Sequence, residues 1–185
     1  MTTDTLSDVG FRLKGGASRN YVKKTWKLSF NKFEKGRKFY QQKKVALKAM
    51  QQDVSAIKEI LVLSMLYSMN APAQRYGYSQ LFINEQSMGA YLMVEAVDDQ
   101  FLDSRFGNDD GALFKCNGDL AYLGMDPETY QNLTVGHNNA YNPQTDAAEE
   151  NFGLLRDFIK ILNVTSDEEF VKLLRLYIDI IERFC

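Results

Sequence analysis

Two adjacent glycines near the start of the chain are followed by a hydroxyl and a guanidinium side chain, a combination that can bind an anion. They lie in the segment RLKGGASRNYVKKTWKLSF, residues 12–30. Gly15 and Gly16 can adopt positive φ angles that turn successive backbone amides toward an anion, and Ser18 and Arg19 could supply further donors. A Gly-Gly-Ala-Ser run is more often only the turn of a hairpin. A phosphate-binding loop and a plain basic hairpin are therefore both open.

The strands that would position this segment follow from the alternation of apolar and polar residues. Period-two patterns predict strands at 9–14 and 22–30, which pair as a hairpin around the Gly-Gly-Ala-Ser turn. A third strand is predicted within 43–50, where Val45 and Leu47 share a face. This part of the chain is therefore expected to form an antiparallel sheet.

A helix and a second hairpin follow. The spacing of apolar residues predicts a helix of about four turns, which starts after Asp53 and stops at Asn70 and Pro72. The next segment reads as two strands around a turn at 84–89, and the second strand ends at Glu95. The predicted order is three strands, one helix and two strands.

The remaining residues are more helical. A short acidic helix is predicted at 98–105, a small strand around Leu-Phe-Lys-Cys, and a turn-rich stretch at 119–143. Two helices follow, beginning at Asp146 and Ser166, each with a glutamate three residues on in capping-box spacing. A boundary near residue 96 divides the chain into domains 1–96 and 97–185.

Charge changes at the same place, although the net charge of the chain is only −2. Residues 1–60 contain 14 Lys and Arg against 5 Asp and Glu, whereas residues 61–185 contain 8 against 19. The first part should attract anions. A solvated basic face is the plain alternative, and no zinc-finger, RNP or helix-turn-helix pattern supports a nucleic-acid partner.

Composition excludes several other classes. No apolar run approaches the ~18 residues of a membrane span, and no signal peptide begins the chain. Cys116, Cys185 and the single His137 do not form a disulfide framework or a zinc site. The pattern is that of a globular α+β protein.

Several segments, in this order, resemble one family. They are VGFRLKGGASR, KKTWKLSFNKF, ALKAMQQD, the helix of Glu59, YLMVEAVDDQFL and LGMDPETY. They resemble the CotH family, which is named after a spore-coat protein and regarded as atypical protein kinases, with fungal members described as invasins. The resemblance covers nearly the whole chain. It implies a kinase-like small β-rich lobe with one inserted helix, followed by a hinge and the first helices of a helical lobe.

The resemblance also implies which residues bind ATP. Lys27 and Glu59 could form the lysine–glutamate pair that orients nucleotide phosphates in kinases. Unrelated surface charges are the alternative, and Lys14 and Lys24 are rival lysines because the register of the hairpin is open. The residues expected at the ATP phosphates are Gly15, Gly16, Ser18, Arg19, Lys27 and Glu59.

The expected hinge is Glu95, Ala96 and Val97, where backbone groups could contact the adenine ring. Asp98 and Asp99 come next and could bind the ribose or a metal ion. Acids that cap the following short helix are the commoner arrangement.

The function implied for an intact parent protein is transfer of phosphate from ATP, with Mg, to Ser or Thr of spore-coat or surface proteins. In the family the catalytic aspartates lie beyond the position of Cys185, so this chain is expected to be a fragment without its own catalytic or metal-binding residues. Asp179 and Glu182 are not assigned that role. The expected location is the spore coat, the cell surface or the extracellular space.

An adhesin or invasin module is the alternative function. The polar, turn-rich residues 117–144 contain three tyrosines and could form a contact loop for a host or coat protein. An ordinary insertion between helices would look the same. Binding of a protein partner without any effect of nucleotide would favour the adhesin.

Overall fold

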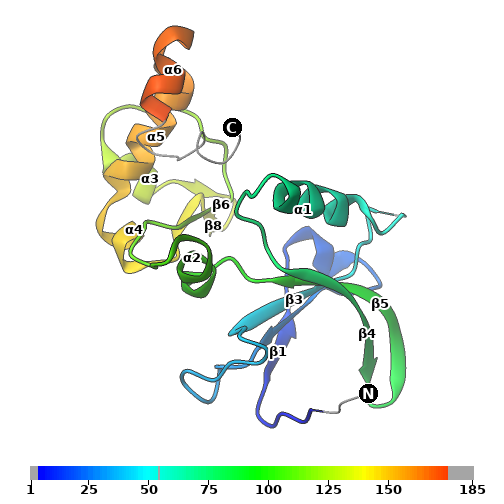
Figure 1. Cartoon of the computed structure of the whole chain (residues 1–185). Helices are drawn as coiled ribbons and strands as arrows, with labels where there is room; N and C mark the ends of the chain where they lie inside the picture. Colours follow the sequence, from blue (N-terminus) through cyan, green and yellow to red (C-terminus); the bar gives the residue numbers. More distant parts are fainter. Residues whose placement is uncertain (1–3, 54, 175–185) are drawn as a thin grey trace. The chain divides into compact units, whose positions relative to one another are not determined.

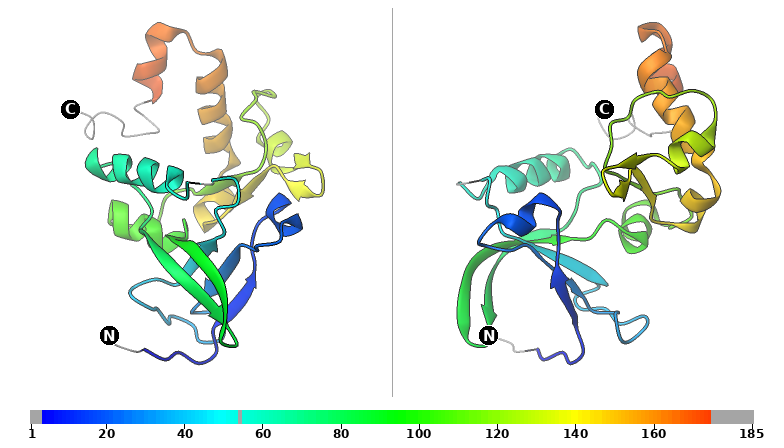
Figure 2. Two further views of the ribbon diagram at one scale, coloured as in Figure 1. Left: turned by 90° about the vertical axis from the view of Figure 1, so that its right-hand side faces the viewer. Right: turned by 180° about the vertical axis from the view of Figure 1, so that it is seen from behind.

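The computed structural model describes residues 4–53 and 55–174, which form two compact units (Figures 1 and 2). The first unit is Met1–Phe101 and the second is Leu102–Cys185. The predicted hinge residues Glu95, Ala96 and Val97 all lie in the first unit. The end of the last predicted helix, including Asp179 and Glu182, lies outside the described residues.

An antiparallel sheet of five strands forms the centre of the first unit, in the order β1-β2-β3-β5-β4. The strands are β1 (Gly10–Leu13), β2 (Trp26–Ser29), β3 (Lys44–Lys48), β4 (Tyr76–Ile83) and β5 (Gln86–Glu95). All five were predicted from the sequence, the first three from the alternation of apolar residues and the last two from a turn at 84–89, and β5 ends at Glu95 as predicted. Together with the helices they confirm the α+β class.

The register shows which side chains share a face of the sheet. Lys27 of β2 is opposite Arg12 of β1 and Ala46 of β3, and Ala46 is opposite Val94 of β5. Directly opposed residues lie on the same face, and so do alternate residues along a strand. We call this face the cationic face. It carries Arg12, Lys27, Lys44 and Lys48, together with Lys14, which directly follows β1.

The opposite face is largely apolar and builds the core of the first unit. Leu47, Ala49 and Tyr91 are buried there, with Trp26 and Leu28 packed against them. Phe11 stacks on Trp26 with ring centroids 4.5 Å apart. Stacked aromatic rings on adjacent strands stabilise the pairing of β1 with β2.

The connection between β1 and β2 differs from the predicted tight turn. A 3₁₀ helix, η1 (Ala17–Asn20), lies within a long connection, and the Arg19 amide donates to the Gly16 carbonyl over 3.1 Å. Gly15 has a φ of +100°, so the left-handed conformation expected of it is present, whereas Gly16 is not among the residues with positive φ. The pairing of β1 continues to a hydrogen bond from the Lys14 amide to the Thr25 carbonyl, at 2.8 Å.

The helix of the first unit, α1 (Lys58–Ser68), begins later than predicted. Asp53 is not its N-cap residue, but its carboxylate accepts a hydrogen bond from the Lys58 amide at 2.7 Å. Such a bond satisfies one of the open amides of the first turn. The apolar residues Leu61 and Met65 are exposed, and the buried residue of the helix is Leu63.

The second unit combines short strands with helices. Its elements are β6 (Phe114–Cys116), α3 (Pro127–Gln131), β7 (Thr134–Val135), β8 (Asn138–Asn139), β9 (Tyr141–Pro143), α4 (Asp146–Glu150), α5 (Phe152–Val164) and α6 (Asp167–Leu174). The helix α2 (Asp99–Phe106) crosses from one unit into the next. Tyr130, Tyr141 and Ile159 are fully buried in the core of this unit.

The helix predicted to begin at Asp146 is divided into two helices, α4 and α5. The backbone of Asn151 leaves the helical conformation, with φ −137° and ψ 66°, and so separates α4 from α5. Thr145 is the N-cap residue of α4, whereas Asp146, the predicted cap, is the first helical residue. The predicted start of α6 at Ser166 is close to the observed start at Asp167, and the Ser166 carbonyl accepts hydrogen bonds from the amides of Glu169 and Phe170.

Candidate functional site

An ion pair joins the sheet to the helix of the first unit. Lys48, the last residue of β3, donates through Nζ to Oε1 of Glu59, the second residue of α1. Both side chains are about one-third exposed, at 34% and 35%. The pair is therefore held by secondary structure on each side and is still accessible from solvent.

The helix is fixed over the cationic face by hydroxyl groups from β4. The Tyr76 and Ser64 hydroxyls are 2.5 Å apart, and the Tyr78 hydroxyl donates to the Ala56 carbonyl at 2.6 Å. Tyr76 is opposite Val94 in the register and so belongs to the cationic face. These bonds hold Glu59 within reach of Lys48.

Five basic residues lie on the cationic face along three neighbouring strands. They are Arg12, Lys14, Lys27, Lys44 and Lys48. Two acidic residues interact with them: Glu59 with Lys48, and Asp98 with Lys44, whose Nζ is 3.3 Å from Oδ2. The described residues thus leave an excess of positive charge on one face of the sheet.

The pKa of Lys27 is affected by burial and by this excess of positive charge. Burial lowers the pKa, and the neighbouring charges of Lys44, Arg12 and Lys14 lower it further, while Asp98 raises it. A half-buried ammonium group beside other cations is a centre that an anion would stabilise. The cationic face is therefore suited to a ligand with several negative charges.

Glu59 pairs with Lys48 and not with Lys27, the partner expected from the sequence. Lys27 lies on β2, opposite Ala46, and is one strand farther from α1 than Lys48. The rival Lys24 donates to the Arg19 carbonyl at 2.6 Å. Lys48 could have been found from the sequence, because it ends the strand directly before the helix and is only 11 residues from Glu59.

The predicted phosphate loop lies beside this face at the end of β1. Gly15 has the positive φ that the prediction required, and Arg19 is exposed at the end of η1. The backbone of Ser18 belongs to η1. The assignment of these residues, Gly16 included, to ATP phosphates stays a prediction.

The three predicted hinge residues differ in their surroundings. The Glu95 carboxylate is 2% exposed and accepts hydrogen bonds from the Arg75 amide at 2.9 Å and from its Nε and Nη2 at 3.3 and 3.0 Å. The Glu95 carbonyl accepts from Gln74, and the Ala96 amide donates to the Lys44 carbonyl at 3.3 Å. Val97 is 43% exposed. Val97 is therefore the residue of this segment most accessible to a ligand.

The two aspartates after the hinge both contact lysines. Asp98 interacts with Lys44, and Asp99 Oδ2 is 2.5 Å from Lys43 Nζ. Burial raises the pKa of Asp99, but the hydrogen bonds from Lys43 and from the Gln100 amide, together with the charges of Lys43 and Lys44, outweigh this effect, and the pKa lies below its ordinary value. These carboxylates tie the start of α2 to the beginning of β3.

Residues 4–53 and 55–174 contain no group of three or more His, Cys, Asp or Glu side chains placed to hold a metal ion. Within the same described ranges, each helix is too short or too polar to cross a membrane.

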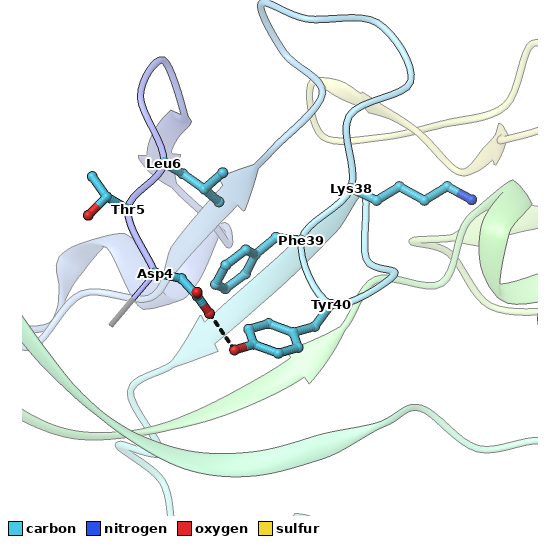
Figure 3. A pocket seen from close by; sticks show the side chains of 6 residues that line it. All are labelled: Asp4, Thr5, Leu6, Lys38, Phe39 and Tyr40. Atoms are coloured by element: carbon cyan, nitrogen blue, oxygen red, sulfur yellow. Dashed lines mark hydrogen bonds between the residues drawn. The ribbon is translucent and has the colours of Figure 1, made fainter. Parts of the chain in front are cut away.

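A cavity of about 350 Å³ lies elsewhere on the first unit (Figure 3). Its lining residues are Asp4, Thr5, Leu6, Lys38, Phe39 and Tyr40. The Tyr40 hydroxyl donates to Asp4 at 2.5 Å across it, whereas the Lys38 side chain points away from the others in Figure 3. None of the residues predicted to bind ATP lines this cavity.

Comparison with known proteins gives a match over most of the chain. The family model described as CotH kinase protein matches residues 11–184. Inner spore coat protein H of Bacillus subtilis (strain 168) is 24% identical over 177 residues, which are 94% of this chain and 46% of that protein. The chain therefore spans about half the length of this curated relative. Both matches confirm the resemblance inferred from the sequence motifs, and neither favours the adhesin alternative.

Proposed function

This chain belongs to the CotH family, and we propose that its first unit binds the phosphates of ATP on the cationic face, as the nucleotide-binding part of a protein kinase. The observation that carries this proposal is the hydrogen-bonded pair of Lys48 and Glu59. In protein kinases a lysine of the third strand pairs with a glutamate of the next helix and contacts the nucleotide phosphates. The same kinds of residue occupy the same elements here.

The local sequence around Lys48 supports the assignment. Residues 45–48 read Val-Ala-Leu-Lys, which matches the Val-Ala-Ile-Lys pattern of the kinase third strand except for one aliphatic exchange. The element order supports it too, since one helix follows the third strand of a five-stranded antiparallel sheet. We therefore interpret the first unit as a kinase-like small lobe.

Three of the five basic residues of the face have stated roles in this proposal. Lys48 contacts the phosphates, and Glu59 orients its ammonium group. Lys27 and Lys44 neutralise the remaining charge, which offsets the burial and the like-charge repulsion that lower the pKa of Lys27. The loop with Gly15, Gly16, Ser18 and Arg19 covers the phosphates. The hinge of Glu95, Ala96 and Val97 contacts the adenine through the backbone of Val97, because the Glu95 amide and carbonyl and the Ala96 amide already form hydrogen bonds within the first unit.

Magnesium is the cofactor that the family implies, and the described residues do not provide a site for it. Mg²⁺ requires oxygen ligands, usually one or two carboxylates besides the phosphates. Glu59 and Asp98, the acids at the cationic face, are both engaged with lysines. We therefore expect these 185 residues to bind nucleotide without transferring phosphate.

The name of the relative suggests the setting of the whole protein. Inner spore coat protein H is a coat protein by its description. We propose that the intact protein containing this chain acts in the spore coat and phosphorylates Ser or Thr residues of coat proteins. Detection of phosphoserine or phosphothreonine on coat proteins, present with the intact protein and absent with its Lys48→Ala variant, would test this step.

Nucleotide binding can be tested on the 185-residue chain by titration calorimetry with ATP. The variant Lys48→Ala should lose about tenfold or more in affinity, because a hydrogen bond between charged groups contributes roughly 1.5–3 kcal/mol. Lys35→Ala removes the same charge from an exposed loop outside the cationic face and is the matched control. Equal affinity of the two variants would contradict the proposal.

A further inference from the structure

A small pocket of about 170 Å³ lies in the first unit, beside the strand face opposite Lys48 and Glu59. Val45, Met93 and Glu95 line it, and they alternate along β3 and β5 with the cationic-face residues Ala46 and Val94. These three side chains therefore face away from the basic residues proposed to bind the phosphates, whereas Tyr76, which also lines the pocket, belongs to the cationic face.

Gln42 is the polar group of this pocket that lacks a partner. Its side chain is buried, with 9% exposure, and its Nε2 makes no hydrogen bond. A buried unpaired amide donor costs about 1–3 kcal/mol. The terminal torsion of a glutamine is soft, so Nε2 can turn toward an acceptor placed in the pocket.

The turn before Gln42 is strained in a way that places two side chains at the pocket. Tyr40 and Gln41 both have positive φ, 45° and 61°, although neither is glycine. Hydrogen bonds of 2.9 Å in both directions between Phe39 and Gln42 close this two-residue turn. Glycine or asparagine would form it at lower cost. Residues kept in such conformations often belong to binding sites, where contacts elsewhere offset the strain.

The charges at the pocket are already balanced. Glu95 accepts three hydrogen bonds from Arg75, and both residues line the pocket. A further anion would lie beside a buried carboxylate, and a further cation beside a guanidinium group. Either would be disfavoured by desolvation and by the like charge. The occupant should therefore be neutral.

The size and lining indicate a single ring. An apolar protein cavity of about 150 Å³ accommodates benzene, and this pocket is of similar volume. Val45 and Met93 provide apolar and thioether contacts, and Tyr40 and Tyr76 add aromatic ones. An aromatic ring would replace water on these surfaces.

We propose that this pocket binds a neutral aromatic ring with an acceptor oxygen, the chemistry of phenol, and that Gln42 Nε2 donates to that oxygen. The group could belong to a free phenolic molecule or to a tyrosine side chain of a bound polypeptide. The proposal does not rest on phosphate binding, because none of the five basic residues of the cationic face lines the pocket.

The test uses p-cresol as the probe and toluene as the control that lacks the oxygen. In the 185-residue chain labelled with ¹³C at the methionine methyl groups, p-cresol should shift the NMR signal of Met93, assigned with a Met93→Leu variant. It should bind about five- to tenfold more tightly than toluene, as one hydrogen bond of roughly 1 kcal/mol allows. Benzoate, which is charged, should bind more weakly than p-cresol.

The variant Gln42→Leu separates recognition from folding. It should lose the preference for p-cresol over toluene, while its melting temperature without ligand stays equal to the wild-type value or rises, because an unpaired donor has been removed. Gln86→Leu makes the same exchange at an exposed position of β5 and should retain the preference.

Three results would overturn the proposal: no shift of Met93, equal affinities for p-cresol and toluene, or a preference that persists in Gln42→Leu. The affinity of a short peptide with a central tyrosine shows whether the natural ring belongs to a polypeptide or to a free molecule. Tighter binding of the peptide than of p-cresol assigns a polypeptide, and binding of p-cresol alone assigns a free small molecule.

Discussion

Two ion pairs on opposite faces of the same sheet differ in their access to water. Lys48 and Glu59 are each about one-third exposed, whereas the Glu95 carboxylate is only 2% exposed, although the side chain of its partner Arg75 is 40% exposed. Both pairs join neighbouring elements of the first unit. The difference indicates that one pair is available to a ligand and the other is structural.

Desolvation explains why the two ion pairs should contribute differently to stability. An exposed pair contributes roughly 0.2–1 kcal/mol, because water screens its attraction and the long side chains lose freedom. A buried carboxylate depends on its partner, since removal of that partner leaves a charge without solvation. Glu95 accepts three hydrogen bonds from Arg75, one of them from the backbone amide. Its side chain thereby fixes the last residue of β5, directly before the proposed adenine contacts.

The largest effect should follow removal of the buried pair's cation. Arg75→Met should lower the free energy of unfolding by about 3–5 kcal/mol, because it leaves the buried Glu95 carboxylate uncompensated. Urea denaturation followed by circular dichroism measures this change. The double variant Arg75→Met with Glu95→Met should recover much of the loss, since both charges are then absent. A loss below about 1 kcal/mol in the single variant would show that the pair of Arg75 and Glu95 contributes no more to stability than an exposed ion pair does.

The exposed pair should give a much smaller effect on stability. A double-mutant cycle of Lys48→Met and Glu59→Gln should yield a coupling energy below about 1 kcal/mol, which decreases further at high salt. The measurement is again urea denaturation, at two ionic strengths. A coupling above about 2 kcal/mol, independent of salt, would indicate a structural pair and weaken its assignment to phosphate binding.

Much of this arrangement could be predicted from the sequence, because it depends on local patterns. Alternation of apolar residues located β1, β2 and β3, and β4 and β5 were predicted around a turn at 84–89. That turn is formed by Asn84 and Glu85, within the predicted range. The family motifs carried the resemblance that the CotH match confirms. Strand positions, family and fold class were therefore accessible without coordinates.

The pairing of charges could not be predicted in the same way, because it depends on register and on where a helix begins. Asp53 was expected to cap α1 directly, but the helix starts at Lys58 and places Glu59 in its first turn. There Glu59 meets the end of β3 instead of the middle of β2. The buried pair at Glu95 gave no sequence signal either, since only the β4–β5 register brings Arg75 opposite Glu95.

The smallest effect concerns Lys27, whose charge joins neither pair. Burial and the neighbouring cations lower its pKa from the ordinary 10.5, so the unfolded chain binds this proton more tightly than the folded one. Stability therefore rises with pH between the lowered pKa and 10.5, and the charge costs stability below that window. Lys27→Met should unfold at slightly higher urea than wild type at pH 7, and this advantage should shrink as pH passes through the window. Lys35→Met, at an exposed position, is the control. If the advantage of Lys27→Met does not change with pH, burial and the neighbouring cations do not lower the pKa of Lys27.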